Sequence, residues 1–255
     1  MKIKLLLSAL CCILSPVVVH ADGGGHGHDR VSIESEVKVL QASDKIAFSF
    51  QIFDNESKKE ITDTDLKLSH TKKVHFIVYD AALKEFNHVH PEFVNGLWQT
   101  ELNLPVNGAY FIWAQGTLND GAEFSVSNKL KVEGGKSPWS VTNLGDHRKE
   151  TSNHTTVELS QQKIRAGKMI MLTYRVSRDD GSLPVVTPYL GANAHVIAIS
   201  PDGKDLIHVH PMDGQDTASG MLHATFPRVG DYRMWVQLND HDELKTVPLS
   251  VTVVE

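Results

Sequence analysis

Apolar and polar side chains alternate over short segments along most of this chain. Residues 46–52 are Ile-Ala-Phe-Ser-Phe-Gln-Ile, and residues 169–174 are Met-Ile-Met-Leu-Thr-Tyr. A period of two residues is typical of β-strands that bury one face. No stretch has the 3.6-residue period of an amphipathic helix. The pattern therefore predicts an all-β protein of mainly antiparallel strands.

The chain also contains one block of sequence twice. His-Val-His-Pro begins at His88 and again at His208, 120 residues later, and residues 108–113 (GAYFIW) resemble residues 230–235 (GDYRMW). Seven or so strands in about 100 residues are typical of a β-sandwich. We therefore expect two tandem antiparallel β-sandwich domains, immunoglobulin-like or cupredoxin-like, over residues 31–133 and 154–255. The polar residues 134–153 would link them, and the Tyr and Trp of the repeated block would anchor the cores.

The amino-terminal residues predict export. Lys2 and Lys4 precede an apolar run over residues 5–19, and the small residue Ala21 ends a cleavable pattern, so residues 1–21 are predicted to be a signal peptide. The product would be periplasmic or secreted. Residues 22–30 form a glycine-rich tail with two histidines, for which we expect only a weak accessory role.

Composition then excludes several classes. Both cysteines lie inside the predicted signal, so the mature chain has no thiolate for a disulfide, an iron–sulfur cluster or a blue-copper centre. Loss of Lys2 and Lys4 leaves 23 basic against 31 acidic residues, a net charge of −8, which argues against a nucleic-acid partner. No second apolar stretch approaches the roughly 20 residues that cross a bilayer, so the chain is not expected to span a membrane.

Histidines at matched positions carry the candidate chemistry. In each copy a further histidine stands 13 residues upstream of the His-Val-His motif. Alternate residues of a strand share a face, with Cα atoms about 6.6 Å apart, so both histidines of each motif can reach one ion. The predicted metal ligands are His75, His88, His90, His195, His208 and His210.

The upstream histidine reaches the same face through a hairpin. If Ala81 and Ala82 form a two-residue loop, His75 lies directly across from His88, and opposed residues point to one face. In the second copy, residues 200–203 (SPDG) are a turn signal. A three-residue bulged loop is an alternative there, and it would place the second set of histidines on different faces.

Three neutral imidazoles with an open fourth position suit Cu(II), Cu(I) or Zn(II), and affinity trends favour copper over zinc. Glu92, Met212 and His241 are candidates for further ligands. The alternative is that the six histidines only pack against their neighbours. We expect such a structural role for four other histidines: His70, His147, His154 and His223.

By these residues the chain resembles the YtkA-like and FixH-like secreted bacterial domains, a group of cupredoxin-like or immunoglobulin-like sandwiches associated with copper or heavy metals. The resemblance is carried by residues 188–195 (PYLGANAH) followed by residues 208–211 (HVHP). The first copy departs from it, because Lys72-Lys73-Val74 precedes His75. The resemblance implies metal binding at the six histidines.

Three functions fit these patterns. The first is an exported protein, not an enzyme, that binds, buffers or delivers copper through three histidines in each domain, with a copper transporter or oxidase as its partner. The second is an adhesive or scaffolding protein that binds no metal. The third, and least favoured, is a metalloenzyme, because no paired carboxylate, nucleophile motif or phosphate loop stands near the histidines.

Overall fold

The structure, a computed structural model, describes residues 30–68, 71–141, 143–189, 192–200, 202–209, 211–213 and 217–255. In this part of the chain the only helix is the short 3-10 turn η1 (Asp63–Asp65), and no helix there is long and apolar enough to cross a bilayer. The predicted signal peptide (1–21), nearly all of the predicted tail (22–30), and His70 and His210 lie outside the described residues. All other elements are strands, in keeping with the predicted all-β class.

The first domain contains eleven strands among the described residues. They are β1 (Val31–Glu34), β2 (Val39–Gln41), β3 (Ser43–Asp54), β4 (Lys59–Glu60), β5 (Leu66–Lys67), β6 (Val74–Asp80), β7 (Phe86–Val89), β8 (Glu92–Val94), β9 (Leu97–Leu104), β10 (Gly108–Leu118) and β11 (Glu123–Glu133). One sheet has the order β1-β3-β9-β8 with β4 beside β3, and the other has the order β2-β11-β10-β6-β7 with β5 beside β10. Alternate residues of both sheets, Phe50, Phe76 and Trp98 among them, form the buried core between them.

The second domain repeats this plan. Its strands are β12 (Lys149–Ser152), β13 (Thr155–Leu159), β14 (Ile164–Arg165), β15 (Met169–Arg178), β16 (Val186–Thr187), β17 (His195–Ile199), β18 (Leu206–Val209), β19 (Pro211–Asp213), β20 (Ser219–Thr225), β21 (Gly230–Asp240) and β22 (Glu243–Val254). The sheets have the orders β12-β13-β15-β20-β19 and β14-β22-β21-β17-β18. Two tandem sandwich domains are thus present. Each also has one parallel pair, β2 with β11 and β14 with β22, beside its antiparallel pairs.

The second domain begins earlier than the predicted linker allows. Strand β12 lies inside residues 134–153, yet it pairs with β13 over four residues, from Lys149 opposite Glu158 to Ser152 opposite Thr155. Polar composition suggested a linker because β12 is an edge strand, and an edge strand can keep most of its side chains in water.

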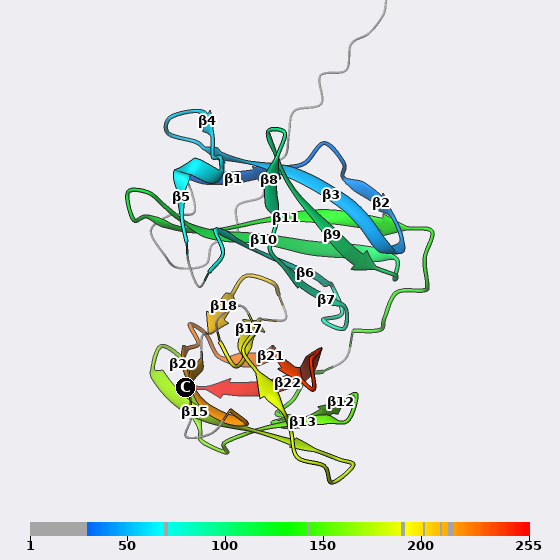
Figure 1. Cartoon of the computed structure of the whole chain (residues 1–255), viewed down its shortest axis with the longest axis vertical. Helices are drawn as coiled ribbons and strands as arrows, with labels where there is room; N and C mark the ends of the chain where they lie inside the picture. Colours follow the sequence, from blue (N-terminus) through cyan, green and yellow to red (C-terminus); the bar gives the residue numbers. More distant parts are fainter. Residues whose placement is uncertain are drawn as a thin grey trace, which may run out of the picture.

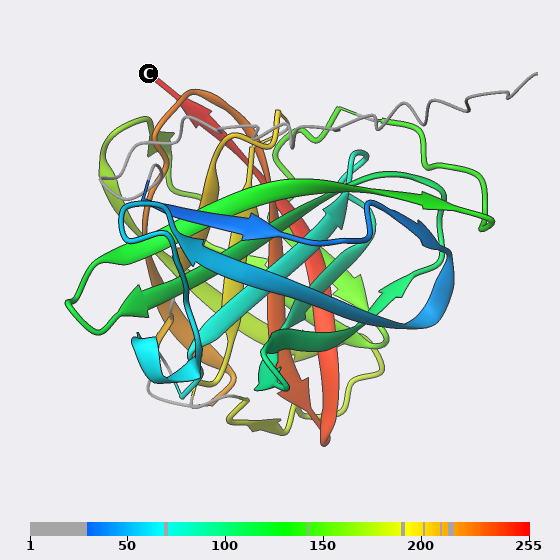
Figure 2. The same ribbon diagram turned by 90° about the horizontal axis from the view of Figure 1, so that it is seen from above.

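The two domains pack against each other through the sheets that contain β6 and β17 (Figure 1). Seen from above, the strands of the second domain run across those of the first (Figure 2). An apolar cluster fills this contact, and we call it the interdomain cluster. Its buried members are Ile77, Tyr79, Leu83, Trp113, Leu144, Ile197, Ile199 and Trp235.

Aromatic rings dominate the interdomain cluster. The rings of Phe86 and Trp235, one from each domain, stack with centroids 4.4 Å apart. The turn at Gly203 (φ +68°) approaches Tyr79 so closely that a Cβ there would lie 3.2 Å from the phenol oxygen. Tyr110 and Tyr232 anchor the two cores, as predicted. Trp113 and Trp235 are equally buried, but they hold the domains together instead.

Candidate metal centre

Strand β6 is buried on both faces, which places His75 between the domains. Val74, Phe76 and Val78 point into the first core, whereas Ile77 and Tyr79 point into the interdomain cluster. Because strand side chains alternate, His75 shares the face of Ile77 and Tyr79. Its side chain is buried, with 2% of its surface exposed.

The hairpin that brings the other two histidines differs from the predicted one. Ile77, not His75, is opposite His88, so the register is shifted by two residues. The loop is longer than two residues because the Asp80 carboxylate accepts hydrogen bonds from the backbone N–H groups of Ala82, Lys84 and Glu85. A shift of two residues keeps each side chain on its predicted face.

The second hairpin has the same register. Ile197 is opposite His208 and Ile199 opposite Leu206, which corresponds to the first hairpin displaced by 120 residues. Ser200 N–H donates to the carbonyl of Asp205, and Gly203 N–H donates to that of Ser200. This pairing excludes the alternative three-residue bulged loop.

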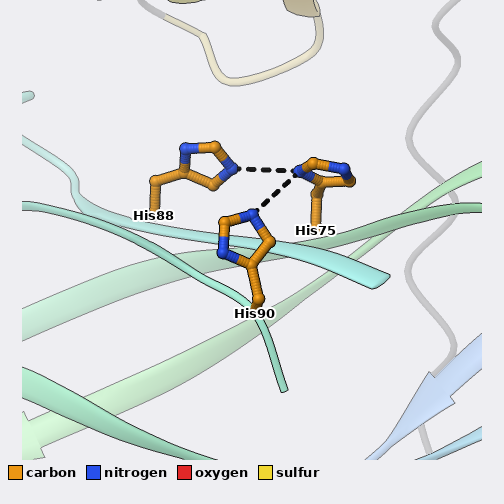
Figure 3. Close-up of side chains that lie close together, drawn as sticks. All are labelled: His75, His88 and His90. Carbon is orange, nitrogen blue, oxygen red and sulfur yellow. Dashed lines mark hydrogen bonds between the residues drawn. The ribbon is translucent and has the colours of Figure 1, made fainter. Parts of the chain in front are cut away.

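The three histidines of the first domain converge on one point (Figure 3). His75 Nδ1 lies 3.2 Å from His88 Nε2 and 3.1 Å from His90 Nε2. One nitrogen from each ring lies within 4.8 Å of the other two. Two nitrogens bound to one tetrahedral ion at about 2.0 Å lie about 3.3 Å apart. The two short separations match those around a tetrahedral metal ion, and they also match N–H···N hydrogen bonds.

A residue of the second domain orients one of these rings. His88 Nδ1 lies 3.0 Å from Gln237 Oε1, an amide oxygen that only accepts hydrogen bonds, so His88 Nδ1 carries the hydrogen. The Gln237 amide is itself held, since its Nε2 donates to Thr246 Oγ1 at 3.1 Å. In the neutral His88 ring the lone pair is consequently on Nε2, which faces His75 and His90.

Burial keeps these rings uncharged. Desolvation, and then the proximity of His90, His75 and His195, holds the pKa of His88 well below 6.5. Desolvation, together with His75, Lys72 and His195, lowers the pKa of His90 to about 3. Both rings are therefore neutral at pH 7, which is the form that binds metal ions.

The upstream histidine of the second domain lies beside this cluster. The ring centroids of His195 and His88 are 5.8 Å apart. His195 Nε2 donates to the carbonyl of Tyr189 at 2.8 Å, which in a neutral ring leaves the lone pair on Nδ1. One predicted ligand of the second site thus lies beside the first histidine cluster.

The remaining predicted residues have different placements. His208 is described through its backbone alone and His210 lies outside the described residues, so the structure places only the His195 ring of the second trio. Glu92 is an exposed residue of β8, in the sheet opposite β6. His241 lies in the turn after β21, where its Nδ1 is 2.8 Å from Asp240 Oδ1. Met212 is an exposed residue of β19.

Gln237 is a site residue that the sequence patterns did not identify. A signal was present, because Trp-x-Gln occurs at Trp113–Gln115 and again at Trp235–Gln237. Each glutamine is opposite the upstream histidine of its own domain, Gln115 opposite His75 and Gln237 opposite His195. Only the domain arrangement brings Gln237 to His88 as well.

Fold and site together define a class: tandem β-sandwich proteins with a buried three-histidine cluster at the contact between the domains. The chain belongs to the family described as a domain of unknown function (DUF8832), which matches residues 26–134 and again residues 149–255. The two matches agree with two tandem copies. Membership in the YtkA-like or FixH-like group is not part of this match.

No curated protein matches the sequence at a significant level. Among solved structures, the chain is similar to the fibronectin(III)-like modules of CbhA from Clostridium thermocellum, with 14% identity over 88% of this chain and 93% of that chain, and a TM-score of 0.24. It is also similar to the Escherichia coli adhesin FdeC (11% identity, 92% of this chain, 66% of that chain, TM-score 0.29). It is similar as well to invasin, a bacterial integrin-binding protein, with 15% identity over 86% of this chain and 38% of that chain, and a TM-score of 0.25.

The chain thus spans less than two thirds of the adhesin and invasin structures. At these identities and TM-scores the likenesses say nothing about function.

Proposed function

We propose that this protein binds a transition-metal ion through His75, His88 and His90, and that copper is its physiological ion, with zinc as the competing one. The role is buffering or delivery of the ion without catalysis. A copper transporter or oxidase would be the partner. Three imidazoles leave the fourth coordination position of a tetrahedral ion open, and a ligand from the partner could bind there while the ion is transferred.

One observation carries the proposal: a single nitrogen, His75 Nδ1, faces two other ring nitrogens at hydrogen-bond distance. His88 Nε2 has no hydrogen when His88 Nδ1 donates to Gln237. If the neutral His75 ring carries its hydrogen on Nδ1, that one hydrogen faces two nitrogens, His88 Nε2 and His90 Nε2. If Nδ1 carries no hydrogen, its lone pair faces the lone pair of His88 Nε2. Only one of the two contacts can be a full hydrogen bond, whereas a cation accepts all three lone pairs.

Copper is preferred because nitrogen sites bind Cu(II) more tightly than Zn(II), and because imidazole suits both oxidation states of copper. The absence of cysteine from residues 22–255 leaves nitrogen, oxygen and thioether donors for the ion. The predicted signal peptide over residues 1–21 and the resemblance to secreted copper-associated domains also support a periplasmic or secreted copper protein.

A second ion in the second domain is part of the proposal. His195 occupies the position that corresponds to His75, and the β17–β18 register repeats that of β6–β7. We expect His195, His208 and His210 to hold this ion. Because His195 lies beside His88, the two ions would be close neighbours at the interface.

The test is titration of the purified protein with Cu(II) and with Zn(II), followed by calorimetry. We expect two tight equivalents. The double variant His88→Ala with His90→Ala should lose one of them, and His208→Ala with His210→Ala the other. The matched control is His147→Ala with His154→Ala, which removes two exposed imidazoles and should keep both equivalents. Retention of every equivalent in the His88/His90 variant would refute the proposal.

The second candidate function is a scaffold in which the histidines only pack. The burial of His75 and His88 next to the interdomain cluster favours it, because such rings also fill space between domains. In that case no tight equivalent would be found. The His88/His90 variant would then lose stability without any change in metal affinity, which unfolding in urea would measure.

A further inference from the structure

Four of the six methionines of this chain lie on the outer face of one sheet in the second domain. Strand β15 contributes Met169 and Met171, strand β20 contributes Met221, and strand β19 contributes Met212. This sheet is on the side of the domain that faces away from the first domain (Figure 1). Met171 and Met212 expose nearly half of their surface, and Met169 exposes 70%.

Strand pairing places three of these methionines around a histidine. Met212 is directly opposite Met221, and Met171 is directly opposite His223. Met221 and His223 are two residues apart on β20, so they share one face. Directly opposed Cβ atoms lie about 5 Å apart and diagonal ones about 7 Å. Met171 and Met212 lie on the two strands that flank β20, more than about 10 Å apart. Their long, flexible side chains can reach inward over β20 to one ion beside Met221 and His223.

The fold itself does not require sulfur here, because the first domain provides a matched comparison. Its equivalent strands β3, β9 and β8 pair Ala47 with Glu101 and Glu92 with Gln99. By register, Ala47 corresponds to Met171, Gln99 to Met221, Glu92 to Met212 and Glu101 to His223. One copy of the sandwich therefore has polar or small residues at each position where the other has a thioether or an imidazole.

We propose that Met171, Met212, Met221 and His223 form a second kind of metal site, selective for a soft monovalent ion such as Cu(I). Thioethers are soft, neutral ligands that favour Cu(I) over Cu(II) and Zn(II), and one imidazole completes a neutral donor set. His223 is exposed, so its ring is accessible to an ion from solvent. The site is separate from the buried histidine cluster of the first domain, which lies against the other sheet of the second domain.

The experiment uses Ag(I), a redox-inert substitute for Cu(I), added to protein with ¹³C-labelled methionine methyl groups. The background variant has His88, His90, His208 and His210 replaced by alanine, so that neither proposed histidine site can take up the probe. We expect one saturable equivalent that shifts the methyl signals of Met171, Met212 and Met221. Met234, fully buried in the core, is the internal control and should not shift.

The matched variant replaces Met171, Met212 and Met221 with leucine, which keeps their size and apolar character on an exposed face. It should bind Ag(I) at least a hundredfold more weakly, while Met169→Leu, on the same face but opposite Thr225, should change affinity less than threefold. A second variant, Met171→Ala with Met212→Glu and Met221→Gln, installs the residues of the first domain and should also lose the ion.

Unmoved methyl signals, or equal Ag(I) affinity in the leucine variant, would overturn this inference. Either result would leave the proposed Cu(II) and Zn(II) binding at the buried histidines unaffected, because those ions do not depend on the thioethers. If the protein binds Ag(I) but no tight Cu(II) equivalent, the proposed histidine sites are refuted and the methionine site is supported.

Discussion

His88 of the first domain and Gln237 of the second are joined by a 3.0 Å hydrogen bond, although 149 residues separate them in the sequence. The bond fixes the hydrogen on His88 Nδ1 and aims the Nε2 lone pair at His75 and His90. An amide from one domain thus sets the tautomer of a candidate ligand in the other. The histidine cluster and the domain contact are linked through this pair.

Replacement of Gln237 should therefore weaken metal binding without removing a ligand. We expect Gln237→Leu to lower the affinity of the first site by roughly 10- to 100-fold, the effect of losing a group that orients a ligand. Calorimetric titration with Zn(II) measures it. Gln99→Leu, an exposed glutamine of β9, is the control. Unchanged affinity in Gln237→Leu would mean that the His88 ring is held by packing alone.

Metal binding should stabilise the folded protein. A ligand at 100 times its dissociation constant adds about 2.7 kcal/mol to the free energy of unfolding when it binds only the folded state. We expect a gain of this size from each of the two proposed sites with Zn(II) in urea unfolding, and we expect the contribution of the first site to vanish in His90→Ala. His90 is the least buried of the three rings, so its replacement disturbs the fold least. A gain that is undiminished in His90→Ala would place the stabilising ions elsewhere.

The interdomain cluster should contribute strongly to stability. Trp235 is 1% exposed and stacks on Phe86, so Trp235→Ala should cost about 3–5 kcal/mol of unfolding free energy. Trp139→Ala is the comparison, since Trp139 is half exposed and makes one hydrogen bond to Glu85; its cost should stay below about 1 kcal/mol. Denaturant unfolding followed by circular dichroism measures both. Equal costs would show that the domains do not stabilise each other.

Asp240 should make stability dependent on acid. Its burial raises its pKa, but hydrogen bonds from Thr155, the Val185 N–H and Arg178 outweigh this and lower the pKa to about 2. The unfolded value is about 3.9, so the folded state is favoured by about 2 kcal/mol above pH 4, and this is lost as the pH falls to 2.

The measurement is urea unfolding between pH 2 and pH 5 for the natural protein and for Asp240→Asn. The variant should be less stable at pH 5, and its stability should fall less on acidification. Asp44→Asn, on an exposed part of β3, should keep the full dependence. Parallel pH profiles for the natural protein and Asp240→Asn would contradict this assignment.

Much of the first site followed from the sequence because it depends only on which residues of a strand share a face, and alternate residues always do. Alternation along β6, and along β7 with the residue that follows it, puts His75, His88 and His90 on one face. This survives the two-residue shift that Asp80 imposes on the hairpin. The shift itself was not predictable, since it depends on hydrogen bonds from the loop backbone to one carboxylate. The start of the second domain was misplaced for a related reason: β12 is polar and is a strand only because β13 pairs with it.

The sequence by itself determined the all-β class, the tandem repeat and the matched histidine spacing, because these depend on local periodicity and on comparison of the chain with itself. Only the tertiary structure decided that the histidine face of β6 meets the second domain, that Gln237 reaches His88 and that His195 lies beside it. Those contacts join residues more than 100 positions apart. They are fixed by how two sheets bury a shared apolar surface, which no local pattern encodes.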